Sequence, residues 1–173
     1  MSDQQQYLLS EATAARFARE VAKYPAEQKQ SAVMACLSIV QQEQGYVSRA
    51  AEDVIAAYLG MPAIAVYEVT TFYNMYNQRQ LGRFKLNVCT NLPCQLRGGQ
   101  QALEHLCGKL GVDEGGTTAD GLITVQKSEC QGACADAPVL LVNDRQMCSF
   151  MSNERLDELV ATLQAHAQSS AKN

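Results

Sequence analysis

Apolar residues between Ser10 and Tyr76 recur at intervals of three and four positions, the period of one face of an α-helix. Serine, proline and glycine interrupt this stretch at points that typically begin or end helices. The β-branched run Val69-Thr70-Thr71 near its end would also suit a strand. Short connections imply antiparallel neighbours packed as a small bundle. We expect four helices: Ser10 to Tyr24, Pro25 to Gly45, Ser48 to Gly60, and Pro62 to Tyr76.

After residue 80 the pattern changes to short apolar runs, typical of β-strands, that alternate with helical periodicity. The segment between the first two strands is long enough for a helical crossover between parallel strands. The last two strands read as a hairpin that turns at Asn143-Asp144. We expect strands at 84–88, 122–125, 138–142 and 145–148, and helices at 96–110 and from Ser152 onward.

These elements predict an α+β fold with two domains. Residues 1–80 form an N-terminal helical bundle, and residues 81–173 form an αβ domain, with the boundary between Gln78 and Gly82. In the second domain the order β-α-β-β-β-α gives a mixed sheet with helices against it. This order resembles that of thioredoxin-like ferredoxins.

Charge and composition exclude several classes of function. The net charge of −4 is spread evenly, with six basic and eight acidic side chains in residues 1–80 and eight and ten in residues 81–173. No basic stripe is present for nucleic acid, and no apolar run approaches the ~18 residues of a membrane span. The first residues lack the features of a secretory signal, which favours a bacterial cytoplasmic location. Nucleotide-binding and hydrolase motifs are also absent from the sequence.

Four of the seven cysteines form two closely spaced pairs, Cys89 with Cys94 and Cys130 with Cys134. Each pair follows a predicted strand and lies in a predicted loop. Because the carboxyl ends of parallel strands meet at one edge of a sheet, both pairs should converge on one small volume.

Three chemistries could use four converging thiols. Disulfides are the least favoured, because cytosolic thiols are normally kept reduced. A dithiol oxidoreductase is also disfavoured, because the sequence has no C-x-x-C motif. A zinc site usually spaces its ligands by two to four residues, so zinc remains open. The third is a [2Fe–2S] cluster, in which each iron takes two protein ligands, and the spacing favours it over zinc. The positive end of a helix after Cys94 and the flexible Gly132 would suit such a charged centre.

The remaining chemistry-bearing residues are expected to be structural. Cys36, Cys107 and Cys148 fall in apolar patterns and should behave as small buried hydrophobes. His105 and His166 should lie on helix surfaces in solvent, with no carboxylate beside them. The aromatic residues late in the helical part are expected to fill a core rather than to contact a partner: Tyr67, Phe72, Tyr73 and Tyr76.

Three motifs together resemble the 24 kDa [2Fe–2S] subunits of respiratory complex I: Val66-Tyr67-Glu68-Val69-Thr70-Thr71-Phe72-Tyr73, Cys89-x₄-Cys94, and Glu129-Cys130-Gln131-Gly132-Ala133-Cys134-Ala135-Asp136-Ala137-Pro138. The similarity runs from about Ser10 to Leu163. It implies a helical bundle followed by a thioredoxin-like domain that binds one [2Fe–2S] cluster. The implied ligands are Cys89, Cys94, Cys130 and Cys134.

The same resemblance implies an electron-transfer subunit of NADH:quinone oxidoreductase with no catalytic site of its own. FMN and NADH would be bound only by a partner subunit, and the complex would hold the chain at the inner (plasma) membrane without insertion. Departures occur at Thr70, where relatives often have Ala, and at Met147-Cys148-Ser149-Phe150. Two alternatives stay open: a diaphorase subunit of a soluble NAD-linked hydrogenase or formate dehydrogenase, and a zinc-stapled thioredoxin-like interaction module.

Overall fold

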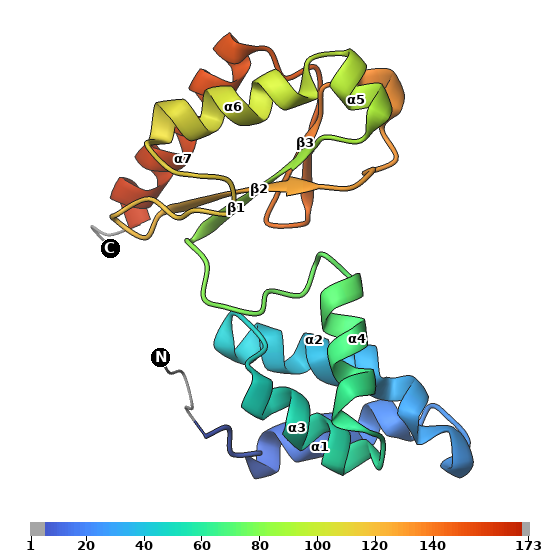
Figure 1. Cartoon of the computed structure of the whole chain (residues 1–173). Coiled ribbons are helices and arrows are strands. Elements are labelled where there is room, and N and C mark those ends of the chain that lie inside the picture. The colour runs from blue at the N-terminus through green and yellow to red at the C-terminus, as the bar shows by residue number, and fades with distance from the viewer. Residues whose placement is uncertain (1–5, 171–173) are drawn as a thin grey trace. The chain divides into compact units, whose positions relative to one another are not determined.

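The computed structural model describes residues 6–170 of the chain. The first five residues, which carry part of the prediction about a signal sequence, and residues 171–173 lie outside this range. The chain divides into two compact units, Met1–Gln80 and Leu81–Asn173, each with its own apolar core (Figure 1). No helix among the described residues is long and apolar enough to cross a membrane.

The N-terminal unit is helical, as predicted. It contains α1 (Glu11–Val21), the 3₁₀ helix η1 (Ala26–Ala32), α2 (Val33–Gln44), α3 (Arg49–Leu59) and α4 (Ala63–Phe72). The hydroxyls of Ser10 and Ser48 accept backbone N–H groups and begin α1 and α3, which confirms both predicted caps. The first turns after Pro25 are 3₁₀ rather than α-helical, and the last helix ends at Phe72 instead of Tyr76.

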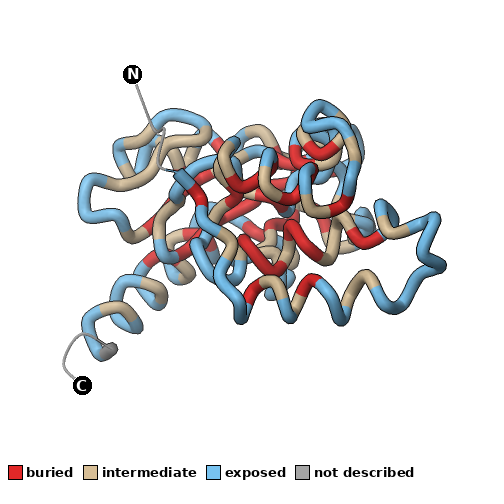
Figure 2. The backbone as a smooth tube through the Cα atoms, turned by 90° about the horizontal axis from the view of Figure 1, so that it is seen from below, coloured by how far each residue is buried: buried red, intermediate tan, exposed pale blue. Residues whose placement is uncertain are grey.

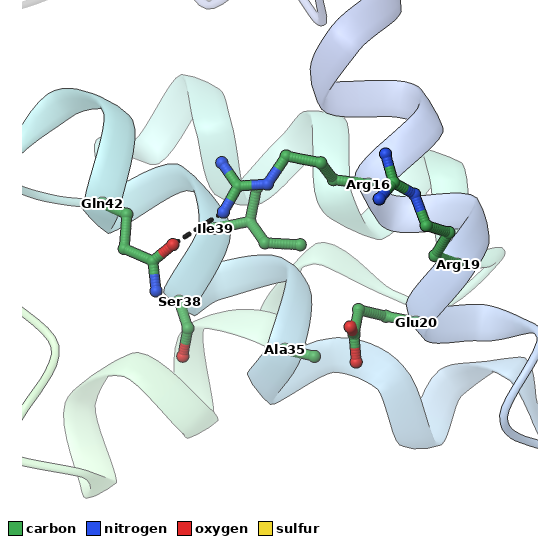
Figure 3. Close-up of a pocket in the computed structure, with 7 residues that line it drawn as sticks. All are labelled: Arg16, Arg19, Glu20, Ala35, Ser38, Ile39 and Gln42. Atoms are coloured by element: carbon green, nitrogen blue, oxygen red, sulfur yellow. Dashed lines mark hydrogen bonds between the residues drawn. The ribbon is translucent and has the colours of Figure 1, made fainter.

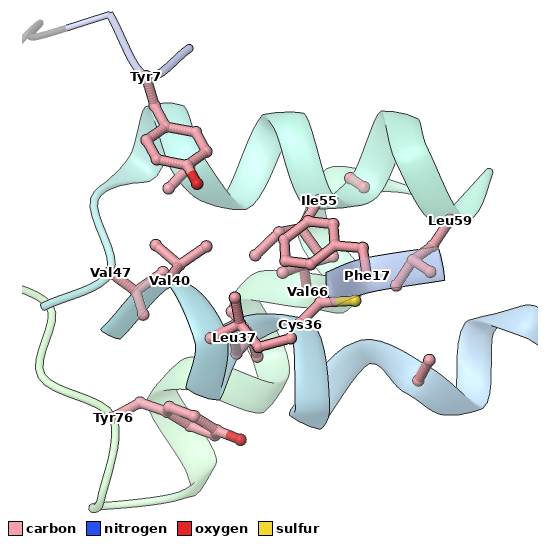
Figure 4. Packing of buried hydrophobic residues seen from close by; sticks show 14 residues of the cluster. Tyr7, Phe17, Cys36, Leu37, Val40, Val47, Ile55, Leu59, Val66 and Tyr76 are labelled. Atoms are coloured by element: carbon pink, nitrogen blue, oxygen red, sulfur yellow. The ribbon is translucent and has the colours of Figure 1, made fainter. Parts of the chain in front are cut away.

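The four α-helices meet around a continuous apolar core (Figure 4). Phe17 of α1 and Ile55 of α3 are fully buried there, and the ring of Phe17 packs edge-on against Tyr58 at 5.3 Å. Cys36 is also fully buried, and this burial raises the pKa of its thiol to about 12. Its role as a small core hydrophobe is therefore confirmed.

A buried carboxylate joins α3 to α4 in the same unit. The side chain of Glu52 accepts a hydrogen bond of 2.5 Å from the Thr70 hydroxyl and forms an ion pair of 2.8 Å with Arg49. The guanidinium of Arg49 in turn lies over the ring of Tyr67, 3.5 Å from its centroid. The Val69–Thr71 run is helical, and from this helix Thr70 donates to Glu52.

Replacing Thr70 by Val should destabilise the N-terminal unit by about 1–3 kcal/mol, since the variant keeps the shape but leaves an oxygen of Glu52 buried without its donor. Thermal unfolding followed by circular dichroism measures the effect. Thr71→Val is the matched control, because the Thr71 hydroxyl is exposed and bonds only to carbonyls of its own helix. Equal melting temperatures for the two variants would contradict the role given to Thr70.

The C-terminal unit has a four-stranded mixed sheet in the order β2-β1-β3-β4. Strand β1 pairs in parallel with β2 and antiparallel with β3, and β3 pairs antiparallel with β4. The predicted hairpin is confirmed, with its turn residues Asn143 and Asp144 both at positive φ. The bounds are β1 (Phe84–Cys89), α5 (Leu92–Leu96), α6 (Gly99–Leu110), β2 (Ile123–Ser128), the 3₁₀ helix η2 (Cys134–Asp136), β3 (Leu140–Val142), β4 (Gln146–Cys148) and α7 (Asn153–Ser170).

The two faces of this sheet differ in chemistry. Side chains alternate between the faces of a strand, so Phe84, Leu86 and Val88 of β1 share one face, which α6 and α7 cover (Figure 1). Lys85 and Asn87 lie on the opposite face and are also buried, so that β1 is buried over its whole length; buried segments of the chain are red in Figure 2. Alternation places Cys89, the last residue of β1, on this second, polar face.

Candidate metal centre

The two cysteine loops leave the sheet at the same edge. Because β1 and β2 run in parallel, their carboxyl ends are side by side, and Cys89 stands opposite Ser128 in the register. Cys94 lies in the short helix α5, which directly follows β1. Cys130 follows β2 after a single residue, and Cys134 begins η2. The backbone therefore brings the two cysteine loops to one edge of the sheet, as predicted from the sequence.

The structure brings the sulfurs together as two pairs of unequal exposure. Cys89 and Cys94, the first thiol pair, are hydrogen-bonded to each other, and each is 2% exposed. Cys130 and Cys134, the second thiol pair, are exposed, with 3.9 Å between their Sγ atoms. The pairs are also close enough for charge on Cys134 to act on Cys94.

The thiols disfavour one another's ionisation. Burial, the hydrogen bond with Cys89 and charge on Cys89 and Cys134 raise the pKa of the Cys94 thiol to about 11, although the backbone N–H of Val139 lowers it. The hydrogen bond and charge of Cys130 raise the pKa of Cys134. Crowded thiolates repel, and a metal cation among them would reverse this effect by favouring the deprotonated form. The donor set is chemically that of a thiolate metal centre.

A glycine lets helix α6 begin directly against the first cysteine loop. A Cβ atom at Gly99 would stand 2.6 Å from the carbonyl oxygen of Cys89 and 2.9 Å from that of Cys94. Such contacts are shorter than any side chain tolerates, so only glycine fits. The predicted helix 96–110 is confirmed as α6, which begins three residues later, after Gly98 with its φ of +93°, and the short helix α5 before it was not predicted.

Backbone hydrogen bonds hold the second loop, residues 129–137, in place. Gly132 has a φ of +77° and directs its N–H to the sulfur of Cys130 at 3.4 Å. Phe150 also adopts a positive φ, +54°, and donates its N–H to the carbonyl oxygen of Asp136 at 2.7 Å. Arg155 supports this corner with a hydrogen bond to the carbonyl of Ser149. The segment 147–150, singled out as a departure, therefore braces the loop that carries Cys134.

The two thiol pairs fit a [2Fe–2S] cluster, which takes two thiolates at each iron. Ala133, Ala137 and Val139 pack against the first pair and give it an apolar wall. Two backbone N–H groups, from Gly132 and Val139, reach the sulfurs, as a negatively charged centre requires. Within residues 6–170, no three His, Cys, Asp or Glu side chains are arranged around a single metal ion, so the fit rests on the two separate pairs, each of which would bind one iron.

Two predictions about other residues were wrong. His105 is not without a carboxylate, because α7 packs beside α6 and brings Asp157 within 2.8 Å of its Nε2 atom. Among the aromatic residues Tyr76 is buried, but the Phe72 side chain is 80% exposed and Tyr73 is exposed beside it. Both errors concern contacts between elements, which helical periodicity does not report.

A separate cavity of about 340 Å³ lies between α1 and α2 in the N-terminal unit (Figure 3). Arg16 and Arg19 line it together with Glu20, and Arg16 is held by Gln42 and by Glu43 at 2.7 Å. Arg16 and Glu20 of its lining form ion pairs with Glu43 and Lys23, and no cysteine lines the cavity. The cysteine loops remain the candidate functional site.

A thioredoxin-like sheet with two thiol pairs at one edge defines a ferredoxin-type domain. Residues 17–164 match the family model described as thioredoxin-like [2Fe-2S] ferredoxin. The chain belongs to this family.

Several similar proteins are named as subunits of NADH-quinone oxidoreductase. The chain is 39% identical over 144 residues to NADH-quinone oxidoreductase subunit 2 of Thermus thermophilus, a match that covers 83% of this chain and 80% of the relative. It is 38% identical over 144 residues to the E 2 subunit of NADH-quinone oxidoreductase from Rhizobium meliloti, with coverage of 83% and 84%.

A solved structure of an NAD⁺-reducing [NiFe]-hydrogenase in the air-oxidised state has the same fold, with a TM-score of 0.64 at 22% identity. The match covers 78% of this chain but only 23% of the hydrogenase chain. At this identity the likeness describes the fold alone.

Replacing Gly99 by Ala should displace the first cysteine loop and lower the iron content of the purified protein to less than about half that of the wild type. Iron and acid-labile sulfide analysis measures this. Gly108→Ala in the same helix is the control, since its Cβ would meet no atom within 4 Å, and it should leave the iron content unchanged. Full iron content in the Gly99 variant would show that a Cβ atom at this position does not displace the first cysteine loop.

In the metal-free protein, an alkylating reagent should label Cys130 and Cys134 first, because both are exposed. Cys36 should resist labelling until the protein unfolds, since it is fully buried and its raised pKa, about 12, keeps it protonated at pH 8. Mass spectrometry of the labelled peptides, with and without denaturant, distinguishes these thiols. Rapid native labelling of Cys36 would be incompatible with the packing of the N-terminal core.

Proposed function

We propose that this chain is an electron-transfer subunit of an NADH:quinone oxidoreductase and that Cys89, Cys94, Cys130 and Cys134 hold one [2Fe–2S] cluster. The observation that carries the proposal is the convergence of the two thiol pairs at one edge of the sheet. The names of the relatives at 38–39% identity support the assembly. The two compact units would act as domains, residues 1–80 and 81–173.

The bound cluster would supply transfer of one electron at a time. The chain's own residues would set the conditions for this transfer. The first thiol pair and its apolar wall exclude water from one side, while N–H groups of Gly132 and Val139 compensate negative charge at the sulfurs. Because the site is already rich in negative charge, it resists an added electron, which favours a low reduction potential.

The chain would work beside a flavin-bearing subunit that binds NADH, since its sequence contains no nucleotide-binding motif and a one-electron centre does not accept a hydride. Helix α5 offers a surface for such a partner. Leu92 and Leu96 are one helical turn apart and exposed, while Cys94 between them is buried. An exposed apolar pair over a redox site is typical of a contact surface. Through the complex the chain would lie peripherally at the plasma membrane, where the assembly would reduce quinone and translocate protons.

The second candidate is the equivalent subunit of a soluble NAD-linked hydrogenase or formate dehydrogenase. The fold shared with the NAD⁺-reducing hydrogenase favours it. Purification of the assembly from its source distinguishes the two candidates. A membrane-associated complex sensitive to quinone-site inhibitors would support the first, and a soluble complex with hydrogenase or formate dehydrogenase activity would support the second.

Anaerobically purified protein should contain about two irons and two sulfides per chain and give the EPR signal of a reduced [2Fe–2S] cluster. Serine at any of Cys89, Cys94, Cys130 or Cys134 should abolish or strongly alter this signal. Cys107→Ser is the control and should retain it, because Cys107 packs against the core of helices α6 and α7. A colourless protein that contains zinc would instead identify a zinc-stapled interaction module.

A further inference from the structure

Gln131 lies between Cys130 and Gly132 in the second loop, but its side chain reaches back to the sheet. Its Nε2 atom donates to the carbonyl oxygen of Asn87 at 2.7 Å and to the hydroxyl of Ser128 at 2.6 Å. Both hydrogens of the amide group are thus used. The side chain connects the second loop to β1 and β2 at the same time.

The two acceptors stand where the cysteine loops leave the sheet. Ser128 is the last residue of β2 and is paired in the register with Cys89. Asn87 precedes Cys89 by two residues, on the same face of β1. Gln131 therefore fixes the loop of the second thiol pair relative to the strand that ends in the first pair.

The orientation of this amide group is determined by its partners. A backbone carbonyl can only accept, so the NH₂ end of Gln131 must face Asn87. The opposite atom, Oε1, is buried and has no hydrogen-bond partner in the described part of the chain. A buried amide oxygen without a partner is unfavourable, so it offsets part of the stability that the two donated bonds contribute.

Asn87, which accepts from Gln131, is itself held by a partly buried ion pair. The side-chain amide of Asn87 donates to one carboxylate oxygen of Asp144, and the other oxygen pairs with the ammonium group of Lys85 at 2.6 Å. The Lys85 side chain is only 4% exposed. This network fixes the position of Asn87, to which Gln131 attaches the second loop.

One side-chain hydrogen bond joins the two cysteine loops directly, and it is exposed to solvent. Asn91, after Cys89, donates to the carboxylate of Glu129, before Cys130, at 3.1 Å, and the contact is exposed. Exposed hydrogen bonds compete with water and contribute little. Asn91 is therefore a useful comparison for Gln131, because it also ties the second loop to the β1 side of the site, but through an exposed contact.

We propose that Gln131 is a positioning residue that holds the loop of the second thiol pair beside the strand that ends in the first pair before any metal is bound. The inference rests on the proposed function for the use of this spacing, since an inorganic cluster requires both pairs at once. The exposed second pair lacks the burial that fixes the first pair, and the Gln131 amide supplies a fixed attachment instead.

The test compares wild type with Gln131→Leu, which keeps the approximate size but removes both donors, and with Asn91→Ala. The measured quantities are the rate of iron loss to a chelator, the EPR g values, and hydrogen exchange of residues 129–134 in the metal-free protein. Gln131→Leu should lose iron about tenfold faster, with shifted g values and faster exchange in the loop. Asn91→Ala should behave like the wild type.

A double-mutant cycle shows whether the effect passes through the hydrogen bonds. Ser128→Ala removes one acceptor and should accelerate iron loss by about threefold. The double variant Gln131→Leu/Ser128→Ala should lose iron no faster than Gln131→Leu, because the two residues share one interaction. Independent effects would multiply to about thirtyfold and would overturn the proposal.

The outcomes also separate this inference from the proposed function. If the wild type binds no iron while Gln131→Leu still loosens the loop in hydrogen exchange, the positioning role stands and the cluster assignment falls. Wild-type loop exchange in Gln131→Leu would overturn the positioning role, whatever the metal content. A lower melting temperature with unchanged g values and unchanged loop exchange would indicate a merely structural residue and would also overturn it.

Discussion

The parallel ladder between β1 and β2 is the constraint on which the site depends. Its six residue pairs run from Phe84 with Ile123 to Cys89 with Ser128. Because side chains alternate along a strand, a slip of one residue would move Cys89 to the face covered by α6 and α7. Only the observed register places Cys89 on the polar face and starts the second loop beside it. The sequence spacing within each thiol pair can bring the two pairs together only in this strand register.

The two thiol pairs reach the same volume by different physical means. The first pair is fixed by burial, with α6 pressed against its loop at Gly99 and an apolar wall beside it. The second pair is exposed and gains no such packing energy. Hydrogen bonds hold it instead. The N–H of Gly132 donates to the Cys130 sulfur, the N–H of Phe150 donates to the carbonyl of Asp136, and the Gln131 side chain donates to Asn87 and Ser128. A thiolate centre that must admit metal and remain rigid can combine a packed half with a hydrogen-bonded half.

Sequence patterns could predict whatever depends on neighbours along the chain. The caps Ser10 and Ser48, the turn at Asn143-Asp144 and the strand before each cysteine pair follow from local chemistry. The break between α5 and α6 also had a signal, the adjacent glycines at 98 and 99. The contact of His105 with Asp157 and the exposure of Phe72 depend on how separate elements pack, and no local pattern contains that information. For the same reason the thiol pairs could be proposed from the sequence, whereas the contacts of Gln131 with Asn87 and Ser128 could not.

The site and the assembly are specified by different residues. The cysteine loops need only a register, a close-approach glycine and a few inward hydrogen bonds, and a fold like this one also occurs in a hydrogenase chain at 22% identity. A partner protein would contact none of these buried groups directly. It would contact exposed apolar side chains instead, such as Leu96 beside the first loop and Phe72 at the end of α4. If the proposed function holds, the cysteine loops would determine the chemistry of the site, and the exposed side chains would determine which assembly the chain joins.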